Sequence, residues 1–145
     1  MLSGNTLGKK AEKFIIKYLE GLGKYIYVAR FADTYDANKG RWGDPTQKKT
    51  IITRRPCDCM LIWKGTTYFC EIKATTNKKG LTPSLFKEQV AERTRITRAD
   101  GNYLYLVYSD FTKSWYWIDS YDLDENATWP ELEPLIMPEF PEVKE

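Results

Sequence analysis

The sequence predicts an α/β fold, in which helices pack against a central β-sheet. Two segments with helical spacing of apolar residues, 5–20 and 82–100, are separated and followed by short strand-like segments. The chain shows no internal repeat and no second set of such segments, so we expect one domain over residues 1–120. A chain of 145 residues is long enough to bury the core of such a domain.

The first helix is predicted over residues 5–20, where apolar side chains recur 4, 3, 1, 3 and 4 residues apart. They form a stripe that consists of Leu7, Ala11, Phe14, Ile15, Tyr18 and Leu22. Gly21 and Gly23 are expected to end this helix. Glu12 lies at the border of the stripe, from which its side chain can reach past the helix edge towards a neighbouring sheet.

Strands are predicted where apolar, aromatic and β-branched residues are bounded by turn residues. They cover residues 24–31, 58–64, 67–74, 103–109 and 114–118. A tight turn at Gly65-Thr66 is expected between the second and third of them. A polar loop over residues 33–55 precedes this hairpin and has room for one more short strand at 50–53. Thr82-Pro83 is expected to open the second helix, which ends near Gly101.

Charge is distributed unevenly along the chain. Residues 1–118 hold 21 of the 22 Lys/Arg and 11 of the 20 Asp/Glu, whereas residues 119–145 hold one lysine against nine acids. We expect residues 121–145 to form an acidic, proline-containing tail that packs on the domain or trails from it. A basic body fits a polyanionic partner such as nucleic acid. A solvated basic face with an unrelated acidic tail would give the same count, so charge alone leaves both interpretations open.

The chain contains no histidine, which excludes histidine-based triads, histidine-ligated zinc and histidine general bases. Catalysis would then depend on carboxylates, lysine, thiolates or a metal ion bound by oxygen. No apolar run approaches the roughly 18 residues of a membrane span, and the polar N-terminal segment is unlike a secretory signal. We therefore expect a cytoplasmic protein without membrane contact, whose three cysteines are reduced thiols.

The cysteines and the strand aromatics are best explained as core residues. Alternation along the strands puts Cys59 and Cys70 on the face opposite Asp58, and small apolar side chains suit a core. A zinc site would need a fourth ligand that the sequence does not clearly offer. Tyr103 and Tyr105 alternate as core residues do, although a stacking platform for single-stranded nucleic acid is a second interpretation.

Two short motifs carry the candidate chemistry. Asp58 is followed, after twelve residues, by Glu71-Ile72-Lys73. A hairpin that turns on Gly65-Thr66 brings Asp58 opposite Lys73. Opposed residues and residues two apart share a face of the sheet, so Asp58, Glu71 and Lys73 converge at one end of the hairpin.

This convergence predicts a metal site. Two carboxylates and a backbone carbonyl, for which Ile72 is well placed, form a hard-oxygen site suited to Mg²⁺. Such a metal can polarise a phosphoryl oxygen and acidify a bound water, while Lys73 can orient or deprotonate that water. A cross-strand salt bridge on a solvated face would show the same spacing, so spacing alone leaves both open.

The second helix adds two polar residues where its pattern expects apolar ones. Gln89 and Arg93 fall inside the apolar stripe, and buried polar side chains need partners. A metal–phosphate site would supply them. For Arg93 the simpler alternative is a side chain that extends to the rim of the core.

In this order, the elements resemble the PD-(D/E)XK nuclease superfamily. The matching residues are Gly8 and Glu12 on the first helix, Asp58, Glu71-Ile72-Lys73, and Gln89 on the second helix. Within the superfamily, the segment 71–75 and the helix with Gln89 are similar to the Holliday junction resolvases of the archaeal Hjc and bacterial RecU types. The resemblance covers roughly residues 4–110, and it departs from the named motif where Cys57 separates Pro56 from Asp58.

The resemblance implies a restriction-endonuclease-like mixed sheet flanked by helices. It also implies Mg²⁺-dependent hydrolysis of phosphodiester bonds in four-way DNA junctions by a homodimer, with Mn²⁺ as a substitute metal. The site residues carried over are the metal ligands Glu12, Asp58 and Glu71, the water-activating Lys73 and the supporting Gln89. Another repair or restriction-like nuclease of this fold and a non-catalytic nucleic-acid-binding module are the alternatives.

Basic residues expected to contact DNA lie on both helices, in the loop over 33–55 and in the loop that follows the third strand. They are Lys9, Lys10, Lys39, Arg41, Lys48, Lys49, Arg54, Arg55, Lys78, Lys79 and Arg93.

Overall fold

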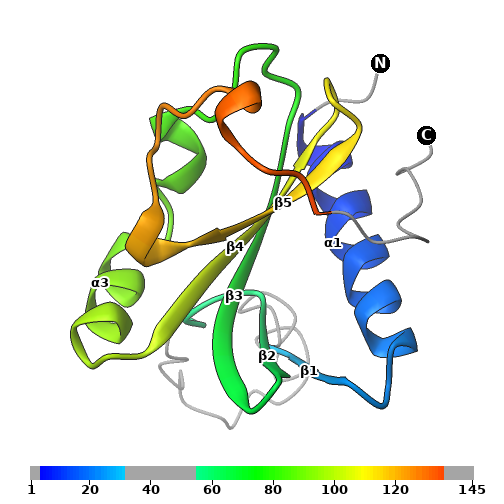
Figure 1. Ribbon diagram of the computed structural model, residues 1–145, viewed down its shortest axis with the longest axis vertical. Helices are drawn as coiled ribbons and strands as arrows, with labels where there is room; N and C mark the ends of the chain where they lie inside the picture. The colour runs from blue at the N-terminus through cyan, green and yellow to red at the C-terminus, as the bar shows by residue number, and fades with distance from the viewer. Residues whose placement is uncertain (1–3, 32–54, 136–145) are drawn as a thin grey trace, which may run out of the picture.

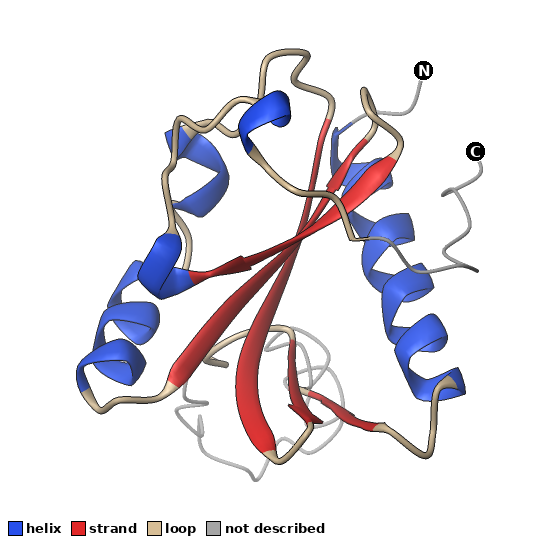
Figure 2. Ribbon diagram, viewed as in Figure 1, coloured by secondary structure: helices blue, strands red, loops and turns tan. Residues whose placement is uncertain are grey.

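A mixed five-stranded sheet lies at the centre of the molecule, with helices on both of its faces (Figure 1, Figure 2). The computed structural model describes residues 4–31 and 55–135. The strands lie side by side in chain order and are β1 (Ile26–Arg30), β2 (Cys59–Trp63), β3 (Thr66–Thr75), β4 (Asn102–Ser109) and β5 (Ser114–Asp119). Of the neighbouring pairs, β3 and β4 are parallel and the other three are antiparallel. The predicted α/β class with a mixed sheet is confirmed.

One face of the sheet is covered by the helix α1 (Gly4–Gly21), whose bounds agree with the prediction (Figure 1). Its apolar stripe is buried, with Leu7, Ala11 and Ile15 at most 3% exposed. These side chains form one core with Cys70 of β3 and Leu106 of β4. Complete burial of a leucine or isoleucine side chain stabilises a fold by about 1.5–3 kcal/mol, so this packing holds α1 firmly on the sheet.

The β2–β3 hairpin turns on Lys64 and Gly65 rather than on the predicted Gly65-Thr66. Lys64 has a φ of 49° and Gly65 a φ of 79°. Two successive positive φ angles are what a type I′ hairpin turn requires, and that turn matches the twist of the strands on either side. Trp63 consequently pairs with Thr66.

The strand register is therefore displaced by two residues from the prediction. Cys59 lies opposite Cys70, which puts Asp58 beside Glu71 instead of opposite Lys73. Because side chains alternate with a period of two, this displacement leaves every side chain on its predicted face. Asp58, Glu71 and Lys73 therefore still lie together at one end of the hairpin, although the predicted register was wrong by two residues.

The connection from β3 to β4 contains two helices in place of the single one predicted over 82–100. They are the 3-10 helix η1 (Pro83–Phe86) and the α-helix α3 (Val90–Arg98). Gln89 separates them with a φ of 64°, a left-handed conformation that an α-helix cannot accommodate. Both helices pack on the face of the sheet opposite α1 (Figure 1).

The same face is closed by the segment after β5, which includes η2 (Ser120–Asp122) and η3 (Trp129–Glu131). Ala127 and Trp129 are buried there, in one core with Tyr103 and Phe86. The part of the predicted acidic tail up to residue 135 thus packs on the domain, and residues 136–145 lie outside the described residues.

All three cysteines are buried and free of disulfide bonds, as their interpretation as core residues predicts. Among the described residues, every helix is too short or too polar to cross a membrane. Most of the predicted polar loop, including the short strand at 50–53, lies outside the described residues.

Candidate active site

Two carboxylates meet inside the molecule where β2 begins beside β3. Asp58 immediately precedes β2, and Glu71 lies within β3. The pairing of Cys59 with Cys70 makes the two acidic residues neighbours across the hairpin. Asp58 is 5% and Glu71 3% exposed. Carboxylates are almost never buried to this extent unless they are paired or bind a cation.

Asp58 is held by donors on both of its carboxylate oxygens. Oδ2 accepts a hydrogen bond of 2.7 Å from the backbone amide of Ile72. Oδ1 lies 2.9 Å from Nη2 of Arg55 in an ion pair. The backbone of Asp58 is fixed as well, because its amide donates to the carbonyl of Cys70 and its carbonyl accepts from the amide of Phe31. The position of this carboxylate is therefore set by both the hairpin and β1.

The carboxyl group of Glu71 has fewer favourable partners than that of Asp58. Burial and the adjacent Asp58 carboxylate raise the pKa of Glu71 to about 9, although Lys73 and Arg55 act in the opposite direction. Oε2 lies 3.7 Å from Nζ of Lys73, whereas Oε1 is buried without a hydrogen-bond partner among the described residues. Ionisation of Glu71 would leave this buried oxygen charged and without a donor, which is destabilising. The pair of carboxylates is therefore suited to a bound cation, and hard cations such as Mg²⁺ prefer oxygen ligands of this kind.

Lys73 links the buried pair to the surface. Its side chain is 16% exposed, and Nζ lies 3.4 Å from Oε2 of Glu88 as well as near Glu71. Glu88 is exposed and was not predicted as part of the site. Its sequence position immediately before Gln89 is the signal that could have identified it. The ammonium group of Lys73 thus lies at the rim, between one buried and one solvated carboxylate.

Glu12 approaches the same end of the sheet from α1. Its Oε1 lies 3.6 Å from Nη2 of Arg30, and Arg30 is paired in register with Cys59, the residue after Asp58. In the described ranges 4–31 and 55–135, no three Asp, Glu, Cys or His side chains are grouped closely enough to hold a metal ion together. The structure thus places Glu12 beside Arg30 of β1 and does not bring it into one cluster with Asp58 and Glu71.

Gln89 and Arg93 lie at the start of α3. Oε1 of Gln89 is buried without a hydrogen-bond partner among the described residues. Arg93 donates a hydrogen bond of 2.9 Å to the hydroxyl of Tyr105 and lies 3.9 Å from Oε1 of Glu125. Tyr105 is the β4 residue opposite Glu71. Arg93 consequently has protein partners beside the site, which the helical pattern alone did not reveal.

The predicted DNA-binding residues fall into three groups. Lys9, Lys78 and Lys79 are exposed, and Lys10 is partly exposed. Arg55 and Arg93 instead form ion pairs within the protein, with Asp58 and Glu125 respectively. The remaining predicted contacts lie outside the described residues and are Lys39, Arg41, Lys48, Lys49 and Arg54.

No protein-family model matches the chain, and no curated protein sequence matches it. Among solved structures, the chain is similar to that of Hjc from Archaeoglobus fulgidus, described as a Holliday junction resolvase from an archaeal hyperthermophile. The two share 13% sequence identity and superimpose with a TM-score of 0.49, over 86% of this chain and 82% of that chain. A likeness at this level carries no functional weight, so the function must be inferred from the side chains of the site.

Proposed function

We propose that the protein is a Mg²⁺-dependent DNA endonuclease of the PD-(D/E)XK type, a Holliday junction resolvase that hydrolyses phosphodiester bonds in four-way junctions. The observation that carries this proposal is the buried pair of Asp58 and Glu71, with Lys73 beside it and Oε1 of Glu71 lacking a donor among the described residues. Burying two carboxylates together lowers the stability of a fold. DNA binding by itself does not require such a pair, whereas a metal-dependent nuclease requires carboxylate oxygens to hold its metal ion.

The metal would be held by Asp58, Glu71 and the carbonyl of Ile72. Glu12, which pairs with Arg30 and is not clustered with the two carboxylates among the described residues, would complete the ligand set from α1 once its side chain turned away from Arg30. When bound, Mg²⁺ or Mn²⁺ would polarise a phosphoryl oxygen and acidify a water molecule. Arg55 pairs with Oδ1 of Asp58 and would give up this contact to the metal. Its planar guanidinium would then be available to a phosphate of the DNA, which it can bind through two parallel hydrogen bonds.

Lys73 would act on the attacking water. Its ammonium group lies 3.7 Å from Oε2 of Glu71, close enough to orient a water at the carboxylate pair and to offset charge that develops on the phosphate. Glu88 holds the same ammonium from the solvent side, which limits the positions that Lys73 can take. Gln89 would support the site through its buried amide oxygen.

The proposed working unit is a homodimer. Resolution of a junction requires cuts in two strands, and the described part of the chain carries one such constellation of residues. A four-way junction has approximate two-fold symmetry, so a two-fold dimer would present two sites to equivalent strands. Lys9 on α1 and Lys78 and Lys79 after β3 are exposed and would bind the DNA backbone.

The experiment that tests this function is a cleavage assay on matched four-way, flap, duplex and single-stranded DNA in Mg²⁺. Paired symmetric cuts in the four-way junction are expected, together with a dimer in sedimentation of the protein alone or on the junction. Cleavage restricted to flaps or single strands would assign the protein to another nuclease activity of this type. Binding of DNA without any cleavage would leave a non-catalytic module, and a strict monomer on junction DNA would exclude the dimer.

A further inference from the structure

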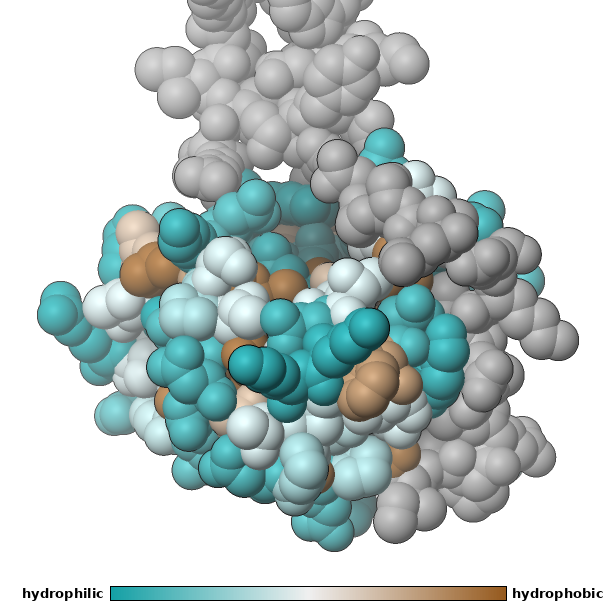
Figure 3. Space-filling model, turned by 90° about the horizontal axis from the view of Figure 1, so that it is seen from above, coloured by the Kyte–Doolittle hydropathy of each residue, from teal (hydrophilic) through white to brown (hydrophobic). Residues whose placement is uncertain are grey.

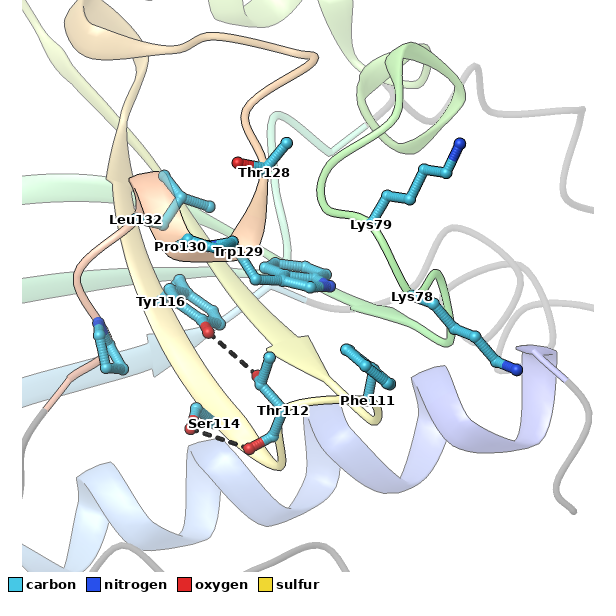
Figure 4. A pocket seen from close by; sticks show the side chains of 11 residues that line it. Lys78, Lys79, Phe111, Thr112, Ser114, Tyr116, Thr128, Trp129, Pro130 and Leu132 are labelled. Atoms are coloured by element: carbon cyan, nitrogen blue, oxygen red, sulfur yellow. Dashed lines mark hydrogen bonds between the residues drawn. The ribbon is translucent and has the colours of Figure 1, made fainter.

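An open pocket lies between three segments on the face of the sheet opposite α1 (Figure 4). It is lined by the loop after β3, the β4–β5 turn and the chain around η3, and it encloses about 810 Å³. Trp129 and Tyr116 stack in it, with ring centroids 5.1 Å apart and planes inclined by 24°. Phe111 lies on the β4–β5 turn and is 55% exposed. Lys78 and Lys79 extend from the loop after β3, beside Trp129 (Figure 4).

The walls of this pocket are fixed to one another by the backbone. The amide of Trp129 donates to the carbonyl of Lys79 at 3.0 Å, and its indole Nε1 donates to the carbonyl of Asn77 at 2.9 Å. Gly80 pairs with Thr128 in an isolated β-bridge, so close that a Cβ on Gly80 would lie 2.1 Å from the carbonyl oxygen of Ala127. A pocket whose walls are already in place loses little conformational entropy when it binds a ligand.

The pocket is close to the candidate active site. Lys73 lies opposite Val107, and Val107 lies opposite Tyr116. Neighbouring strands are separated by 4.7–4.9 Å, so the backbone of Tyr116 is about 10 Å from that of Lys73 across the sheet. Along the chain, Lys78 follows Lys73 by five residues, a span of at most about 17 Å. This distance corresponds to roughly five nucleotides of a DNA duplex.

The chemistry of the pocket fits a nucleotide. Neither Lys78 nor Lys79 forms an ion pair with a residue that the structure describes. Seen from above, this end of the molecule is mostly hydrophilic, with a few hydrophobic side chains exposed among the polar ones (Figure 3). Free ammonium groups beside an exposed aromatic ring are the combination that binds single-stranded nucleic acid, in which lysines contact phosphates and aromatic rings stack on bases.

We propose that this pocket takes the base of an unpaired nucleotide within about five nucleotides of the cut phosphodiester, while Lys78 and Lys79 bind the adjacent phosphates. This inference rests on the proposed nuclease function and refines its substrate class. The preferred DNA would carry an unpaired or extruded nucleotide within a few positions of the cut, as occurs at a distorted strand crossover, a flap or a strand end. The exposed ring of Phe111 provides the stacking surface, and Trp129 and Tyr116 provide the rigid wall.

The test uses two single strands of abasic nucleotides, one of which carries a single 2-aminopurine. Affinity is measured in EDTA, where no cleavage occurs, from the fluorescence anisotropy of a dye attached to the end of each strand. Phe111→Ala should weaken binding of the 2-aminopurine strand about 10-fold and leave binding of the fully abasic strand nearly unchanged. Phe111→Tyr should restore the affinity. Replacing both Lys78 and Lys79 by alanine should reduce the salt-dependence slope by about 1.4 on either strand.

Two exposed residues away from the pocket serve as matched controls. Tyr25→Ala and Lys17→Ala remove an aromatic ring and an ammonium group elsewhere and should leave both affinities unchanged. Wild-type affinity of Phe111→Ala for the 2-aminopurine strand would overturn the proposal, as would equal weakening on both strands. A pocket that receives a protein segment would give the first of these results.

The experiment distinguishes failure of the proposed nucleotide pocket from failure of the proposed nuclease function. If the wild type cleaves DNA while Phe111→Ala binds both strands with normal affinity, the proposal that the pocket binds a base is wrong and the nuclease assignment is retained. If Phe111→Ala loses the base-dependent affinity while the wild type cleaves nothing, the pocket stands and the nuclease assignment fails.

Discussion

Oδ2 of Asp58 accepts a hydrogen bond of 2.7 Å from the backbone amide of Ile72, the residue that follows Glu71 in β3. This bond fixes the Asp58 carboxyl group next to that of Glu71, inside the sheet and away from water. Burial and the neighbouring Asp58 carboxylate disfavour the charged form of Glu71 more than Lys73 and Arg55 favour it. Glu71 therefore retains a proton well above its ordinary range, with a pKa of about 9.

The retained proton makes the stability of the metal-free protein depend on pH. The pKa of Glu71 rises from 4.5 to about 9 on folding, so between these values the folded state binds a proton that the unfolded chain has lost. The resulting stabilisation is complete below about pH 4.5 and is lost as the pH rises towards 9. Glu71→Gln should remove this pH dependence. In EDTA above about pH 7, it should raise the free energy of unfolding by on the order of 1–4 kcal/mol.

Denaturant unfolding of the wild type and Glu71→Gln across this pH range is the measurement. Glu20→Gln, which changes an exposed carboxylate on α1, should follow the wild-type curve. Parallel curves for the wild type and Glu71→Gln would show that Glu71 is not protonated in the folded state.

A second prediction concerns proton release. Because Glu71 must lose its proton to bind a metal ion, each Mg²⁺ should release up to one proton below about pH 9, and affinity should increase with pH by up to about tenfold per unit. Calorimetry in two buffers with different ionisation enthalpies measures this release. Mg²⁺ binding that releases no proton near pH 7 would contradict the coupling.

Lys73 should be required for cleavage and not for DNA binding. Lys73→Met removes the ammonium group that lies between Glu71 and Glu88, and we expect the single-turnover cleavage rate to fall by about 100- to 10,000-fold. Junction affinity should change by only a few fold. Lys64→Met, in the β2–β3 turn, is the control for loss of a lysine. A rate for Lys73→Met within a few fold of the wild type would remove Lys73 from the mechanism.

Gly80 should be irreplaceable because of the chain that packs against it. A Cβ at this position would lie 2.1 Å from the carbonyl oxygen of Ala127 and 2.6 Å from Cα of Thr128. Gly80→Ala should therefore separate the η3 segment from the loop and lower the free energy of unfolding by about 1–3 kcal/mol. Gly8→Ala in α1, where a Cβ meets nothing within 4 Å, should raise it by about 0.5–1 kcal/mol. Equal effects of the two substitutions would contradict the packing described.

The features that could be predicted from sequence are those with a local, periodic signal. The stripe of α1 and the alternation in β2 and β3 identified these elements and the faces that they bury. Even the wrong turn kept Asp58, Glu71 and Lys73 together, because a displacement of two residues does not change the face of a strand. Gly65-Thr66 has the glycine-first pattern of a type II′ turn, whereas Lys64-Gly65 adopts type I′. Only the pairing of the whole hairpin selects between the two.

The features that could not be predicted depend on contacts between distant segments. The break at Gln89 has no signal in the local sequence pattern, and the bond from Arg93 joins α3 to Tyr105 of β4. The burial of Trp129 was hidden by the acidic composition of its segment, although Thr128-Trp129-Pro130-Glu131 carries a readable signal. Thr128 and Glu131 form a capping box, for which the Thr-x-x-Glu spacing is typical.

If Asp58 and Glu71 form the metal-dependent cleavage site of a DNA nuclease, both carboxylates are required for cleavage and neither is required for DNA binding. The most direct measurement compares the wild type with Asp58→Asn and Glu71→Gln, in Mg²⁺, on whichever DNA of the four-way, flap, duplex and single-stranded set the wild type cuts fastest. Each variant should lose at least about 100-fold in cleavage rate, while its affinity for the same DNA in EDTA stays within a few fold of the wild type. A cleavage rate near that of the wild type in either variant would show that cleavage does not depend on this pair of carboxylates.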